Sequence, residues 1–236
     1  MLRARMTTTK PLAAPQLVTD SRMLYTSWIP ADPGALAALL PPALRQAANR
    51  AVYMNQYVVD RAEQTTGFGA YSLTYLGLDV DSFAPDGATP ARFFTHYFNS
   101  SEVVRAYAAA RGVPASPGRT ELERHGRTVT ATTFVEDRPI IRTRAHAGPK
   151  IAATVTGHLK YLTVVDGRIA GGNYPYIGEL AEDFAVESIE FLAPDHPVYA
   201  LRPASPLQVV AGSCFYSPRD SFVYPGGESD MGPAGG

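Results

Sequence analysis

Lysine and cysteine are scarce in this chain of 236 residues. Cys214 is the single cysteine, which excludes an intrachain disulfide and a metal site built from several thiolates. The basic residues include only three lysines, Lys10, Lys150 and Lys160, and arginine supplies the rest. Any mechanism that depends on a lysine amine therefore has at most three candidates in the sequence.

Excess charge and long apolar runs are also missing. The formal net charge of −1 gives no electrostatic attraction toward nucleic acid. No apolar run approaches the ~18 residues that a membrane-spanning helix needs. Arg3 and Arg5 are not followed by the apolar segment of a secretory signal. We therefore expect a cytoplasmic protein that binds neither nucleic acid nor a membrane.

Glycine and proline are abundant, with 20 residues each, compared with a usual combined share of ~12%. This composition favours turns and short strands over a helical bundle. The pair Asp166-Gly167 is typical of a hairpin turn, because both residues tolerate positive φ. Segments rich in Val, Thr, Tyr and Phe predict strands at 51–59, 70–80, 91–98, 127–135, 140–147, 151–165 and 207–216. The expected class is α+β and mainly antiparallel, with a sheet large enough to curl.

A few short helices complete the prediction. Asp32 is suited to cap a helix in which Pro33 takes the first position, where its missing N–H costs nothing. Asn99 can cap a second helix, with Glu102 three residues later completing a capping box. A third short helix is predicted at 177–184.

The chain contains no internal repeat or low-complexity linker. We expect a flexible leader over residues 1–12 and a single domain over residues 13–226. The last ten residues, 227–236, are rich in Gly, Ser and Pro and are predicted to be disordered.

Motifs for metals, phosphates and activated nucleophiles are not present. The five histidines show no metal-binding spacing. The glycine-containing run at 65–69 lacks the Lys-Ser/Thr of a phosphate loop. Gly212-Ser213-Cys214 falls in a predicted strand rather than at a nucleophile elbow. We expect no metal and no cofactor.

Several segments, taken in order, resemble the acetoacetate decarboxylase-like superfamily. They are SRMLYTSWIPADPGALAALLPPAL (21–44), GFGAYSLTYLGLDV (67–80), THYFNSSEVVRAYAAARGVPAS (95–116), GHLKYLTVVDGR (157–168) and RPASPLQVVAGSCFYSPRDSFVYP (202–225). The resemblance implies a curled sheet or β-barrel and a homo-oligomer. It also implies a lysine that forms a Schiff base with a β-keto acid, an arginine that holds the substrate carboxylate, and assisting glutamates.

The residues at the matching positions differ from that pattern. Arg22 matches the substrate-contacting arginine. Ala115 and Ser116 stand at the positions of the Schiff-base lysine and its neighbouring lysine, and Leu73 replaces a glutamate. The second glutamate falls near 54–56, where no carboxylate exists. The chain is thus interpreted as a divergent member that lacks the Schiff-base lysine.

Two residues are the candidate catalytic groups. By the resemblance, His96 faces the substrate and could act as a general acid or base; the alternative is a hydrogen-bonded histidine inside the barrel. Arg22 could hold a carboxylate or enolate; the alternative is an ion pair with Asp20. The candidate substrate-binding residues are Tyr71, Gln56, Asn55, Ser116, Leu73 and Ala115.

The function predicted from these residues is a lyase, isomerase or cyclase of secondary metabolism. It would act without a Schiff base on an oxo or β-dicarbonyl, polyketide-like small molecule, by dehydration, cyclisation or isomerisation. Two alternatives remain open. One is a non-catalytic ligand-binding protein of the same fold. The other is a decarboxylase or aldolase-dehydratase that uses a relocated lysine, Lys150 or Lys160.

Overall fold

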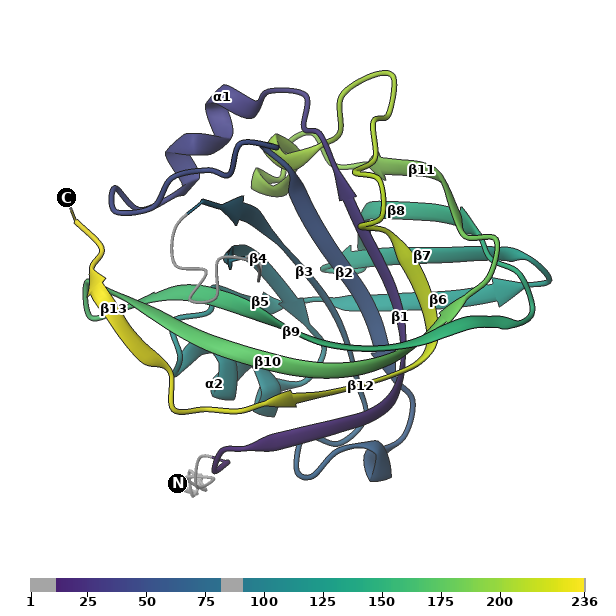
Figure 1. Cartoon of the computed structure of the whole chain (residues 1–236), viewed down its shortest axis with the longest axis horizontal. Coiled ribbons are helices and arrows are strands. Elements are labelled where there is room, and N and C mark those ends of the chain that lie inside the picture. The colour runs from purple at the N-terminus through teal and green to yellow at the C-terminus, as the bar shows by residue number, and fades with distance from the viewer. Residues whose placement is uncertain (1–11, 82–90, 236) are drawn as a thin grey trace, which may run out of the picture.

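A closed barrel is the main feature of the structure, a computed structural model that describes residues 12–81 and 91–235 (Figure 1). The ring closes because one strand near the end of the chain has two partners. It pairs with the first strand on one side and with the second strand of a long hairpin on the other. In order of pairing, the barrel strands are β12 (Phe215–Tyr224), β1 (Gln16–Trp28), β2 (Val52–Val59), β3 (Tyr71–Val80), β4 (Ala91–Asn99), β9 (Ile151–Val165) and β10 (Arg168–Ala181). Each pair is antiparallel except β4 with β9, which is parallel.

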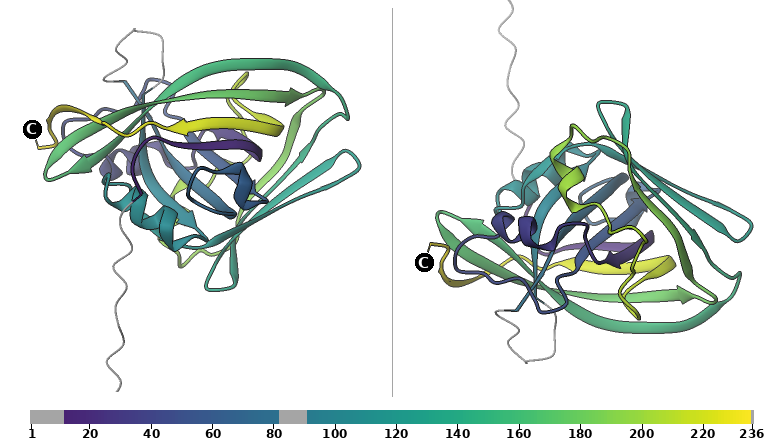
Figure 2. Two further views of the ribbon diagram at one scale, coloured as in Figure 1. Left: turned by 90° about the horizontal axis from the view of Figure 1, so that it is seen from below. Right: turned by 90° about the horizontal axis from the view of Figure 1, so that it is seen from above.

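A second antiparallel sheet covers the outside of β1, β2 and β3 (Figure 2). On the β1 side, Leu24 packs with Leu122 and Val129, and on the β2 side Met54 packs with Ile141. The strands of this sheet are β11 (Ala185–Phe191), β8 (Arg138–His146), β7 (Thr128–Val135) and β6 (Arg119–His125). Because both faces of β2 and β3 are covered, nearly all of their residues are buried, instead of buried and exposed residues alternating along each strand.

Short helices and two short strands surround this framework. They are α1 (Pro33–Leu36), η1 (Ala37–Leu39), η2 (Ala62–Gln64), α2 (Glu102–Ala109), η3 (Pro197–Leu201), β5 (Ala115–Pro117) and β13 (Ser229–Pro233). Within the described ranges, no helix has the length and apolar character needed to cross a membrane. The predicted class, mainly antiparallel α+β with a curled barrel and short helices, is confirmed.

Most of the predicted strands form, and the differences have local causes. The segment predicted as a third helix, 177–184, lies mostly in β10, where tertiary pairing with β9 and β12 decides the conformation. The strand predicted at 207–216 is also wrong, because β12 begins only at Phe215. Asp32 caps α1 as predicted, accepting from Ala35 N at 3.0 Å. The cap of α2 is Ser101 rather than Asn99.

The described part of the predicted tail, residues 227–235, contains a strand. β13 pairs with β10. Ala234 is buried, and its N–H donates to Gly167 O at 2.8 Å. The composition of this segment, rich in Gly and Pro, gave no sign of β13. The strand forms because it pairs with the edge of β10, which is distant in the sequence. The predicted leader, 1–12, lies outside the described residues except for Leu12.

A β-bulge between β3 and β4 decides which side chains of β4 face the barrel interior. Leu76 is opposite His96 and Gly77 is opposite Phe94, so one extra residue lies in β4. Phe94 and Tyr97, three residues apart, consequently both point inward. His96 then falls on the outer face of the strand.

Candidate functional site

The barrel encloses a cavity of about 290 Å³ with mainly aromatic walls. Strands from all parts of the ring contribute to it, and the exposed residues His158 and Gly212 lie at its edge. Its walls include Tyr25, Tyr57, Tyr75, Phe94, Tyr97 and Tyr161. A cavity of this volume and character is suited to a planar small molecule.

Arg92 brings a positive charge into this cavity. Its side chain is nearly buried, and its Nε donates to Asp79 Oδ1 at 3.1 Å. The guanidinium carbon lies 5.1 Å from the ring centre of Tyr25 and 5.0 Å from that of Tyr53, which are cation–π distances. Burial lowers the pKa of Arg92, but Tyr25 and Asp79 more than offset this effect. The group therefore remains charged at every working pH.

Asp220 brings a buried carboxyl group into the same cavity. It lies on β12 opposite Gly178 of β10, where a Cβ atom would stand only 2.3 Å from Asp220 Oδ2. Glycine at position 178 therefore makes room for the carboxyl group. Burial raises the pKa of Asp220 to about 8. A carboxyl group in this state can both give and take a proton near neutral pH.

Tyrosine hydroxyls form two hydrogen-bonded groups inside the barrel. In the first, Tyr57 bonds Tyr71 at 2.9 Å and Tyr224 at 2.8 Å. In the second, Asn55 Nδ2 donates to Tyr75 Oη at 3.0 Å, and Tyr75 Oη lies 2.7 Å from Tyr161 Oη. Burial raises the pKa of these tyrosines. They are therefore neutral hydroxyl groups that can donate hydrogen bonds to a ligand.

The guanidinium and the carboxyl group occupy different ends of the cavity. Arg92 is in register with Tyr161, and Tyr161 is opposite Gly172 of β10. Asp220 is opposite Gly178, six residues further along the same strand. Six residues correspond to about 20 Å of extended backbone. Because both side chains reach into the cavity, the guanidinium and the carboxyl group lie closer together than this. A ligand that contacts both groups must therefore be elongated.

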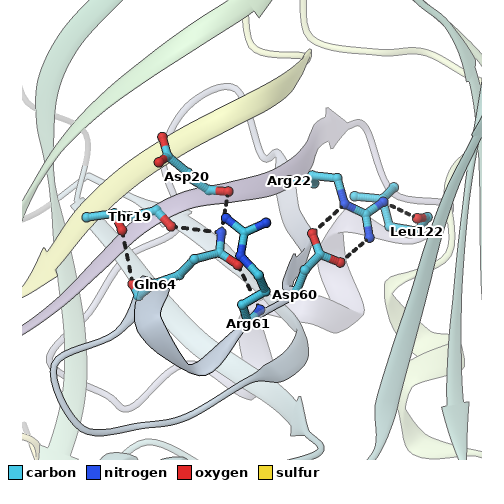
Figure 3. Close-up of polar contacts among 7 residues, drawn as sticks. All are labelled: Thr19, Asp20, Arg22, Asp60, Arg61, Gln64 and Leu122. Carbon is cyan, nitrogen blue, oxygen red and sulfur yellow. Dashed lines mark hydrogen bonds and ion pairs between the residues drawn. The ribbon is translucent and has the colours of Figure 1, made fainter.

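The structure places Arg22 outside this cavity, on the outer face of β1 (Figure 3). Its Nε and Nη2 atoms donate to the two carboxylate oxygens of Asp60 at 2.8 and 2.7 Å, and Nη1 donates to Leu122 O. The ion pair is thus with Asp60 and not with Asp20. β1 is irregular between Val18 and Met23, and this irregularity determines that residue 22 points outward.

His96 is also not brought to the cavity. It lies on the outer face of β4, beside Phe98 and near His196. Burial and the nearby His196 lower its pKa to about 4, so it is neutral at physiological pH. The bulge next to Thr95 is the reason that the predicted inward orientation does not occur.

Among the predicted substrate-binding residues, Asn55 lines the cavity. Gln56 points to the second sheet, where its Nε2 donates to Thr133 Oγ1 at 3.0 Å. Tyr71 and Leu73 belong to the packed interior of the barrel beside the cavity. The two remaining residues lie on β5, where Ala115 packs against that interior and Ser116 Oγ donates to Tyr97 O at 3.4 Å.

The lysines of the described segments do not line the cavity. Lys160 is buried but is adjacent to the inward-facing Tyr161 on β9, so it points to the opposite face. Lys150 is exposed. Lys10 lies outside the described residues. In the same described segments, no three His, Cys, Asp or Glu residues are grouped closely enough to hold a metal ion.

Sequence comparison matches the chain to no family profile and to no curated protein. Solved structures do match. An acetoacetate decarboxylase superposes with a TM-score of 0.69 over 99% of this chain and 96% of its own length, at 12% identity. An acetoacetate decarboxylase-like enzyme from Sphingomonas wittichii RW1 gives a TM-score of 0.62 over 98% and 99%, at 15% identity. The chain has the acetoacetate decarboxylase-like fold.

A third similar structure comes from a biosynthesis enzyme. The enduracididine biosynthesis enzyme MppR, complexed with pyruvate, gives a TM-score of 0.66 over 97% of this chain and 94% of its own, at 11% identity. Identity at this level establishes the shared fold alone. The chemistry of this chain therefore depends on the residues of its own cavity.

Sequence reasoning missed the two charged residues of the cavity. Arg92 was visible as a charged residue at the start of an otherwise apolar strand, and Asp220 as an acidic residue in the closing segment. The sequence did not show whether either side chain points into the barrel or away from it, because bulges in β4 and β12 change the alternation of side chains.

Proposed function

We propose that the protein is an enzyme that moves a proton on an oxo compound, without a Schiff base. Asp220 is the acid–base group, and Arg92 binds the negative charge that develops. The observation that carries this proposal is the presence of a buried carboxyl group and a buried guanidinium in one aromatic cavity. Asp220 replaces His96, and Arg92 replaces Arg22, as the candidate catalytic pair.

The chemistry follows from the two groups. The carboxylate form of Asp220 takes a proton from a carbon beside a carbonyl group, and the electron pair moves to the carbonyl oxygen. In a conjugated substrate this charge can reach an oxygen beside Arg92, where the cation stabilises it. Return of the proton to another atom gives isomerisation, and its delivery to a hydroxyl leaving group gives dehydration. The distance between the two groups favours an elongated, polyketide-like β-dicarbonyl compound.

Enolisation can be tested before the natural substrate is known. In D₂O, the protein is expected to accelerate exchange of the methylene protons of benzoylacetone above the buffer rate, measured by proton NMR. Replacement of Asp220 by Asn removes the proton acceptor and keeps the side-chain shape. We expect this change to lower the protein-dependent exchange by about 100-fold or more.

Asp230→Asn is the matched control, since Asp230 is an exposed carboxylate paired with Arg168 outside the cavity. Its exchange rate should equal that of the wild type. Full exchange activity in Asp220→Asn would contradict the assigned role. Binding of benzoylacetone with no exchange would instead support a non-catalytic ligand-binding protein.

A further inference from the structure

The hydroxyl groups of Tyr75 and Tyr161 leave one hydrogen available to a ligand. They lie 2.7 Å apart, so one of them donates to the other. Asn55 Nδ2 donates to Tyr75 Oη, so Tyr75 already accepts one hydrogen bond from a residue outside the pair. Two hydroxyl groups carry two hydrogens, and their mutual bond uses one. Neither hydroxyl group donates a further hydrogen bond to a described residue, and both tyrosines line the cavity.

The charge of Arg92 favours Tyr161 as the group that presents this hydrogen. Burial raises the pKa of Tyr161, while the Arg92 guanidinium and the hydrogen bond with Tyr75 oppose the rise. A hydroxyl that accepts from one donor and lies beside a cation becomes a stronger donor itself. Phe94 stacks on the Tyr161 ring with a centroid distance of 4.6 Å, which fixes the ring in place.

A second hydroxyl at this end of the cavity has no partner. Tyr25 Oη is buried and makes no hydrogen bond with any described residue. Its ring lies against the Arg92 guanidinium and lines the same cavity. Leaving such a group unpaired costs about 1–3 kcal/mol, a cost that a ligand oxygen would remove.

We infer that the hydroxyl groups of Tyr161 and Tyr25, beside Arg92, form a binding site for an enolate or phenolate oxygen. The inference rests on the proposed function, because it states where the charge of the enolate is held. Arg92 is also paired with Asp79, so the two hydroxyl groups share with Arg92 the stabilisation of a bound anion. Two neutral hydroxyl donors beside this guanidinium suit a delocalised oxyanion on a planar body. The substrate class is therefore a planar, conjugated enol or phenol rather than a short keto acid.

The probe for this site is 4-nitrophenol, whose phenolate form is coloured. Absorbance titration of the bound probe should show its pKa lowered by about one unit or more, equivalent to a tenfold preference for the phenolate. Tyr161→Phe is expected to abolish most of this shift and to weaken phenolate binding about tenfold or more. Tyr25→Phe should remove part of the shift and gives a second test if Tyr161→Phe does not fold.

Tyr174→Phe is the matched control. Tyr174 lines the cavity and contacts the Tyr161 ring edge-on at 5.0 Å, but its hydroxyl has no part in the Asn55–Tyr75–Tyr161 group. The shift should persist in this variant. No binding of the probe, an unchanged or raised probe pKa in the wild type, or a full shift in both Tyr161→Phe and Tyr25→Phe would overturn the inference.

The titration also separates this inference from the proposed function. In Asp220→Asn the nitrophenol shift should remain, because Asp220 lies at the other end of the cavity. A normal shift together with unaffected diketone exchange in that variant would refute the role of Asp220 and leave the oxyanion site intact.

Discussion

Asp220 makes the stability of the protein depend on pH. Its folded-state pKa of about 8 is above the ordinary value of 3.8. The folded state therefore keeps a proton that the unfolded state releases from about pH 4 upward. Stability from this group is fully present below pH 4 and is lost as the pH rises to about 8. Above pH 8 the folded protein must hold a buried negative charge.

Replacement of Asp220 by Asn should remove this dependence. Relative to the wild type, the variant is expected to gain stability steadily between pH 4 and 8, by an amount on the order of 5 kcal/mol in total. Urea unfolding at pH 5 and pH 9 measures the difference. Asp230→Asn should behave in the opposite sense. Arg168 lowers the pKa of Asp230, so that variant loses stability mainly above the ordinary pKa of Asp. An Asp220→Asn variant with the same pH profile as the wild type would contradict a raised pKa.

The sequence was least informative about single side-chain directions. Asn55 was predicted to line the cavity and does so, because β2 is regular and its alternation is preserved. His96 and Arg22 were assigned to the interior by resemblance, yet each follows a backbone irregularity that reverses its face. A one-residue bulge has no reliable signature in a single sequence, but it changes the face of every later residue in the strand.

At the scale of elements, Gly77 shows how closely β3 and β4 approach at their bulge. A Cβ atom on Gly77 would lie 1.9 Å from Phe93 O and 2.4 Å from Tyr53 Oη. Gly77→Ala should therefore destabilise the protein by about 3 kcal/mol or more, since backbone atoms must move. Gly34→Ala is the control. Its nearest contact would be 3.5 Å, and the residue lies in α1, so a change within about 1 kcal/mol is expected. Equal melting temperatures for the two variants would contradict the close approach.

Elements with strong local signals were predicted well. The Asp166-Gly167 turn has positive φ at both residues, and Asp32 caps α1 as expected. β10 and β13 were missed because their conformation depends on partners distant in the sequence. β10 lies between β9 and β12, and a local helical pattern cannot reveal such pairing.

At the scale of the whole molecule, the barrel and the outer sheet share buried apolar surface. Ile141 is fully buried where β8 meets the barrel, whereas Ile151, at the start of β9, is 41% exposed. Ile141→Ala should cost about 2–5 kcal/mol of unfolding free energy, and Ile151→Ala about 0.5 kcal/mol or less. Denaturant titration of both variants measures this contrast. A loss for Ile141→Ala as small as that for Ile151→Ala would contradict the packing of Ile141 between the two sheets. Homo-oligomeric assembly and cytoplasmic location remain predictions.

The pairing of β1 with β12 has a consequence for biosynthesis. The two strands that close the ring are separated by nearly the whole chain, since Gln16 is opposite Tyr224. At about 5–20 residues per second, a ribosome needs roughly 10–40 s to make the intervening segment. During that interval β1 lacks its partner β12, so one of its edges is unpaired and the barrel around Arg92 is incomplete. The cavity can therefore assemble only after β12 has been synthesised, and contacts of such long range make folding slow. Until then, the edge of β1 that will bind β12 is free to pair with strands of other chains.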